Sequence, residues 1–65
     1  MDTIDFEIMK AISNLKVPYP KADRINSLAK LDPEELGARL GVLEMQGYVN
    51  SHSGPLTKIT NNYGN

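Results

Sequence analysis

The chain has 65 residues, enough for one domain built around one small core. It contains 40% hydrophobic and 23% charged residues, with a net charge of −1, one histidine and no cysteine. The absence of cysteine excludes disulfides and thiolate metal sites, and one histidine cannot build a zinc site, so we expect no metal and no cofactor. A net charge this close to zero does not itself indicate nucleic-acid binding, although it allows a local basic patch.

Two features of the sequence, the N-terminal residues and the length of the apolar runs, indicate where in the cell the protein is expected. Acidic residues precede the first apolar positions, where a signal peptide would carry basic ones. The uninterrupted apolar runs are far too short to span a membrane. From these two features we expect a cytoplasmic protein.

The first predicted helix covers about residues 2–16. Asp2 is the expected N-cap, and Asp5 adds negative charge to the first turn. One stripe at helical spacing should face the core, with Phe6 opposite it and Met9 at its edge. This stripe consists of Ile4, Ile8, Ala11, Ile12 and Leu15. Pro18 and Pro20 end the helix and favour extended conformations at the residues that precede them, Val17 and Tyr19.

Two further helices are predicted, over about residues 21–30 and 33–46. The second has its apolar side at Ile25, Leu28 and Ala29. The third begins at Asp32-Pro33-Glu34-Glu35, where Asp32 can cap the helix and the two glutamates suit its positive end. Its core stripe is Leu36, Leu40 and Leu43, and Gly47 is the expected C-terminal cap.

Two strands are predicted at residues 48–52 and 56–60, around the turn Ser53-Gly54-Pro55. Pairing across this turn should place Val49 opposite Ile59 on the core side. We expect one domain over residues 1–60 and a polar tail over 61–65. The predicted core comprises Ile8, Ile12, Leu15, Ile25, Leu28, Leu36, Leu40, Leu43 and Val49.

Two segments resemble winged helix-turn-helix domains. "INSLAKLDPEEL", residues 25–36, resembles the turn before their recognition helix, and "LGVLEMQGYV", residues 40–49, resembles the end of that helix. "DTIDFEIMKAI", residues 2–12, is similar to the opening helix of leucine-responsive regulators. The resemblance implies a mainly α fold with a small β-hairpin, that is, three helices and a wing. Two residues depart from the pattern: Asn26 replaces a small residue, and Lys30 replaces a turn glycine, so we expect Lys30 to be left-handed.

This resemblance implies a DNA-binding or transcription-associated protein, whose third helix would meet double-stranded DNA. The outward face of that helix nevertheless suits base reading poorly, because Glu34 and Glu35 lie at its leading end and Arg39 is its one cation. We therefore expect a weakly basic surface and low sequence specificity. The candidate DNA contacts are Lys21, Arg24, Arg39, His52 and Lys58. His52 and Lys58 are individually better explained as ordinary solvated groups, whereas Lys21 and Arg24 fit either interpretation.

The alternative is a protein–protein or dimerisation surface on the third helix. A strip of small and apolar residues should face outward there, and such patches more often mark protein contacts. The strip consists of Gly37, Ala38, Gly41, Val42 and Met45. The competing interpretation is that the glycines relieve crowding and that Val42 packs under the wing. Phe6 and Met9 could form a second contact patch, or Phe6 could be covered by Tyr63.

Catalysis is not expected. The sequence has no nucleophile and base at a suggestive spacing and no glycine-rich phosphate loop. Asp2, Asp5 and Glu7 are better explained as a solvated and helix-capping set than as catalytic carboxylates. No small-molecule substrate is therefore expected.

Overall fold

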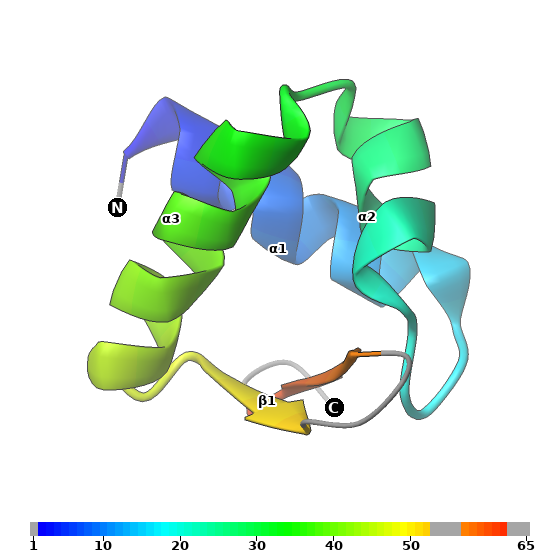
Figure 1. The fold of residues 1–65 in the computed structure, drawn as a ribbon. Helices are drawn as coiled ribbons and strands as arrows, with labels where there is room; N and C mark the ends of the chain where they lie inside the picture. Colours follow the sequence, from blue (N-terminus) through cyan, green and yellow to red (C-terminus); the bar gives the residue numbers. More distant parts are fainter. Residues whose placement is uncertain (1, 53–56, 63–65) are drawn as a thin grey trace.

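The computed structural model describes residues 2–52 and 57–62, which form three helices and a two-stranded hairpin (Figure 1). The elements are α1 (Thr3–Leu15), α2 (Ala22–Ala29), α3 (Pro33–Met45), β1 (Val49–His52) and β2 (Lys58–Asn61). The fold is thus mainly α with a small β part, in the winged helix-turn-helix layout expected from the sequence. In Figure 1, α1 lies behind α2 and α3, and the hairpin closes the lower end. None of the helices in the described ranges is long and apolar enough to cross a membrane.

The helix ends form through local hydrogen bonds, as predicted. Asp2 Oδ1 accepts a bond from the Ile4 N–H at 3.0 Å, and Asp32 Oδ2 accepts one from the Glu34 N–H at 3.0 Å. At the end of α3, Gly47 has a φ of 85°. There the Gly47 N–H donates to the Glu44 carbonyl, and the Tyr48 N–H donates to the Leu43 carbonyl. This pair of bonds is a Schellman motif, which satisfies carbonyls left open at the helix end.

The turn between α2 and α3 explains both departures from the winged-helix pattern. Lys30 is left-handed, with a φ of 56°, as predicted, and its N–H donates to the Asn26 carbonyl at 2.7 Å. The next N–H, that of Leu31, donates to Asn26 Oδ1 at 3.1 Å. The Asn26 side chain therefore supplies an acceptor for the Leu31 N–H, which lies beyond the end of α2. Asn26 and Lys30 act together as one turn.

The core fills the space enclosed by the helices and the hairpin. Seven of the predicted members are buried, and Ala11 and Ile59 join them. The buried set is Ile8, Ala11, Ile12, Ile25, Leu36, Leu40, Leu43, Val49 and Ile59. Leu15 is only partly buried. The placement of Leu28 in the core was wrong: it is 50% exposed and lines a groove beside Glu7, Lys10 and Asn14. Leu28 is three positions after Ile25, which turns it toward the polar flank of α1.

The hairpin register differs from the prediction. Val49 pairs with Asn61, and Ser51 pairs with Ile59, so the predicted pairing of Val49 with Ile59 was wrong by two residues. A slip of two keeps each side chain on its own face, which is why Val49 and Ile59 are both buried nonetheless. Because β2 ends at Asn61, the domain boundary expected at residue 60 falls inside this strand. The predicted turn at residues 53–55 lies outside the described residues, as does Leu56.

The segment between α1 and α2 extends the hairpin by one short stretch of pairing. Lys21 forms an antiparallel bridge with Lys58, and the Ile59 N–H donates to the Pro20 carbonyl at 2.9 Å. Pro20 is buried, while Tyr19 and Lys21 on either side of it are exposed. Proline suits such an edge because it needs no acceptor for a backbone N–H. The segment before α2, β2 and β1 therefore lie side by side, with β2 in the middle.

Candidate functional site

The cation of α3 is held by α1. Arg39 Nε donates to Asp5 Oδ1 at 2.7 Å, and a terminal guanidinium nitrogen donates to Asp5 Oδ2 at 2.6 Å. Asp5 is only 3% exposed, so the expectation that it is a solvated carboxylate was wrong. The hydrogen bonds from Arg39 lower the pKa of Asp5 against the opposing effect of burial, and Asp5 in turn raises the pKa of Arg39. A bidentate pair of this kind occupies the guanidinium and neutralises its charge.

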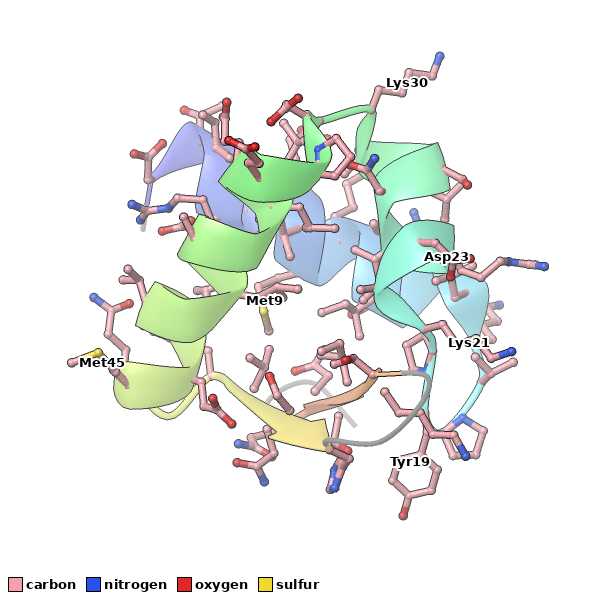
Figure 2. The ribbon with its side chains drawn as sticks, viewed as in Figure 1. Met9, Tyr19, Lys21, Asp23, Lys30 and Met45 are labelled. Atoms are coloured by element: carbon pink, nitrogen blue, oxygen red, sulfur yellow. The ribbon has the colours of Figure 1, made fainter. Side chains whose placement is uncertain are left out.

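The outward side of α3 forms a surface that we call the α3 strip: Gly37, Ala38, Gly41, Val42 and Met45. Met45 is 89% exposed and points away from the body of the protein in Figure 2, whereas Val42 is half-buried. The alternative that the glycines relieve crowding is wrong. A Cβ added at Gly37 or Gly41 would meet no heavy atom within 4 Å. The α3 strip is therefore open to an approaching molecule at Gly37, Gly41 and Met45, and partly covered at Val42.

A shallow groove adjoins the α3 strip on the side of α2. Its volume is about 240 Å³, and Gly37 lies on its wall. Most of the remaining lining is apolar or small, with Asp23 on the α2 side. The lining residues are Ala22, Asp23, Asn26, Pro33, Leu36, Gly37 and Leu40. This groove and the α3 strip offer apolar contact with few charged groups.

A second surface lies on the side of the strands that faces away from the core. Lys58 is directly opposite Lys21 on one side and His52 on the other. Residues directly opposite in antiparallel strands share a face, so these three side chains form a row. Asn50 and Thr60 lie on the same face by alternation along the strands, and Tyr19 joins them because its ring contacts that of His52. We call this surface the wing face: Tyr19, Lys21, Asn50, His52, Lys58 and Thr60.

Two aromatic rings meet on the wing face. The centroids of Tyr19 and His52 are 5.5 Å apart, with the ring planes at 86°. His52 Nε2 lies 2.7 Å from Thr60 Oγ1, a hydrogen bond that fixes the imidazole. Tyr19 is 55% exposed, and Figure 2 shows its ring pointing away from the helices at the lower end of the molecule. The sequence marked Tyr19 only as extended between prolines, so this ring was missed as a candidate.

Three of the five predicted DNA contacts thus come together, namely Lys21, His52 and Lys58. Arg24 is exposed on α2 and shares a groove with Tyr19 and Lys21, which places it next to the row. Arg39 is not part of this group, because it is bound to Asp5.

The other predicted patch does not form as one surface. Phe6 is 57% exposed, as expected for a residue opposite the core stripe. Met9 instead packs partly buried against the core, and Figure 2 shows it directed inward. Tyr63, the residue predicted to cover Phe6, lies outside the described residues.

No protein-family model matches this chain, and no curated protein or solved structure matches it. The chemistry of the wing face and of the α3 strip is therefore the guide to function.

Proposed function

We propose that this protein is a DNA-associated winged helix that grips the phosphate backbone through the wing face. The observation that carries the proposal is the row of Lys21, Lys58 and His52. Two lysines directly opposite each other destabilise a sheet, and an anion between them removes that repulsion. Phosphates are the anions that DNA offers in a regular array, and lysine binds them without reading sequence.

Low sequence selectivity follows from the surface of α3. Base edges are read by side chains that donate or accept hydrogen bonds in the major groove. The α3 strip carries no such group, and Glu34 and Glu35 at the start of the helix would face phosphates of like charge. Asp5 neutralises the charge of Arg39, and removing Arg39 from this pair would leave a buried carboxylate without its partner. Backbone contact from the wing face is consequently the main attraction.

Salt dependence tests this proposal. With about three phosphate contacts, from Lys21, Lys58 and Arg24, duplex affinity should fall with a log–log salt slope of about −3. Replacing Lys21 and Lys58 together with alanine should reduce the slope by about 2 and weaken binding alike for all sequences. The measurement is a titration of labelled duplexes at several salt concentrations.

A matched control replaces two exposed lysines away from the wing face, Lys10 and Lys30, with alanine. Lys30 lies at the opposite end of α2, where Figure 2 shows it directed away from the strands. This control removes the same net charge, but at positions away from the wing face. It should leave the salt slope of duplex binding nearly unchanged if the phosphate contacts come from the wing face. A tight, sequence-selective complex that persists in high salt would contradict the proposal.

A second candidate function is protein contact through the α3 strip. Two observations favour it: the open space at Gly37 and Gly41, and the exposure of Met45. Glycine inside a helix is about 1 kcal/mol less favourable than alanine, and here no neighbour requires its small size. Close approach by a partner, or by a second copy of this chain, would provide such a reason.

Replacing Gly41 with arginine separates the two functions. The position is exposed and uncrowded, so the domain should stay folded. A long cation at the centre of the α3 strip should abolish self-association. Because it lies away from the wing face, it should leave the salt slope of DNA binding nearly unchanged. Sedimentation equilibrium of both proteins, beside a DNA titration, measures both effects. A wild type that stays monomeric at millimolar concentration would exclude a second copy as the partner.

A further inference from the structure

We infer that the wing face prefers single-stranded nucleic acid to duplex, with the Tyr19 ring stacking on an unpaired base while Lys21 and Lys58 hold the flanking phosphates. This inference rests on the proposed function and specifies which form of nucleic acid the wing face binds. Single-strand sites generally combine cations that follow the backbone with aromatic rings that stack on successive bases. The wing face brings both kinds of group together on one surface.

The backbone holds Tyr19 in place for this role. The next residue, Pro20, is buried, and its carbonyl accepts the Ile59 N–H at 2.9 Å. Pro18 precedes Tyr19, so the ring stands between two residues of restricted φ. Lys21, two positions on, is exposed like Tyr19, and both residues line one groove. A base stacked on Tyr19 would therefore have a cation beside it.

The second ring leaves stacking surface available. Tyr19 and His52 are perpendicular, at 86°, so the edge of one ring meets the face of the other. Such a contact uses only one of the four ring faces. His52 is also held by Thr60, and it is exposed. The pair thus presents ordered aromatic surface to solvent, beside Lys58 on the adjacent strand.

The same geometry disfavours a duplex as the ligand. Bases in a duplex are already stacked on one another, so an aromatic ring reaches their faces only after unstacking. Duplex recognition would instead depend on α3, whose outward side is apolar with an acidic start. Asp23 lines the groove that Tyr19 and Lys21 share with Arg24, and its charge offsets part of that of Arg24, so the row of Lys21, Lys58 and His52 attracts phosphate more strongly. The strand would therefore run across the sheet from Lys21 through Lys58 to His52.

The experiment compares labelled single strands with a duplex by fluorescence anisotropy at low salt. The probes are oligo(dT) and oligo(U) of about 15 nucleotides, a length that covers one small site, and a DNA duplex of the same length. We expect the single strands to bind at least about tenfold more tightly. Replacing Tyr19 with alanine should weaken single-strand binding by about 5- to 150-fold, the equivalent of one stacked base. The same change should alter duplex binding by less than about twofold.

Two variants sharpen the result. Tyr19→Trp keeps a larger stacking face and should retain or improve single-strand binding. Phe6→Ala is the matched control, because Phe6 is 57% exposed and Tyr19 is 55% exposed, yet Phe6 lies on α1. It should leave the affinity for both kinds of nucleic acid unchanged. Circular dichroism of each variant verifies the fold.

The outcomes distinguish this inference from the function on which it rests. Duplex bound as tightly as single strands, with no selective loss in Tyr19→Ala, would overturn the inference and leave DNA binding standing. Failure of all three probes to bind would overturn both. Val17 and Tyr19 are half-exposed beside lysines, a combination that an anionic membrane surface could also bind. The experiment therefore includes a binding measurement with vesicles that contain about 30% anionic lipid. Tyr19-dependent binding to these vesicles, without binding to oligo(dT), would identify a membrane surface instead and overturn the inference.

Discussion

Replacing Lys30 with glycine should stabilise the protein. Lys30 has a φ of 56° and a ψ of 47° at the end of α2, a left-handed conformation. For a residue with a Cβ this conformation costs about 1–2 kcal/mol, whereas glycine adopts it freely. Glycine loses about 0.5–1 kcal/mol through the greater freedom of the unfolded chain. The net gain is about 0.5–1 kcal/mol, or about 2–8 °C in Tm for a domain of this size.

The assay is thermal unfolding followed by circular dichroism, with urea unfolding as a second measure. Lys10→Gly is the control, because it also removes an exposed lysine but lies within α1. It should destabilise the protein by about 1 kcal/mol. Lys16 is also left-handed, with a φ of 54°, so Lys16→Gly should repeat the gain at the end of α1. A Lys30→Gly variant that loses stability as Lys10→Gly does would refute a left-handed turn at this position.

Three further changes test the core, a cap and the buried ion pair by urea unfolding. Leu40→Ala should destabilise the domain by about 2–5 kcal/mol, since Leu40 is buried, and near-normal stability would contradict the register of α3. Asp32→Ala should lose about 0.5–2 kcal/mol with the bond to the Glu34 N–H, and an unchanged midpoint would mean that this cap is dispensable. Arg39 holds the pKa of Asp5 below its ordinary value of about 3.9, so the stability from this pair is complete above that pH and declines as pH falls through the lowered pKa. The gap between wild type and Arg39→Met should therefore be largest near pH 7 and shrink below about pH 4; a gap constant down to pH 2 would be inconsistent with the pair.

The sequence by itself determined the three helices and their caps. The cap at Asp32 joins atoms two residues apart, and the Gly47 turn closes within five residues. Interactions this short depend on residue type and spacing, with little influence from the rest of the fold. The left-handed Lys30 was predicted differently, from the resemblance, because it stands where winged helices carry a turn glycine. Helical periodicity likewise identified most of the core, because the angle around a helix follows from position alone.

Tertiary structure alone decided which of these elements meet, and therefore what the surfaces can do. Asp5 and Arg39 are 34 residues apart, and their pairing removed the one cation of α3 from the predicted DNA face. Lys21 lies beside Lys58 only because the segment before α2 joins β2. Periodicity placed Leu28 on the apolar side of α2, but in the structure this side chain faces the polar flank of α1 and is half-exposed. Long-range contacts depend on how far neighbouring elements extend and in which register they pair, and no short stretch of sequence encodes either quantity.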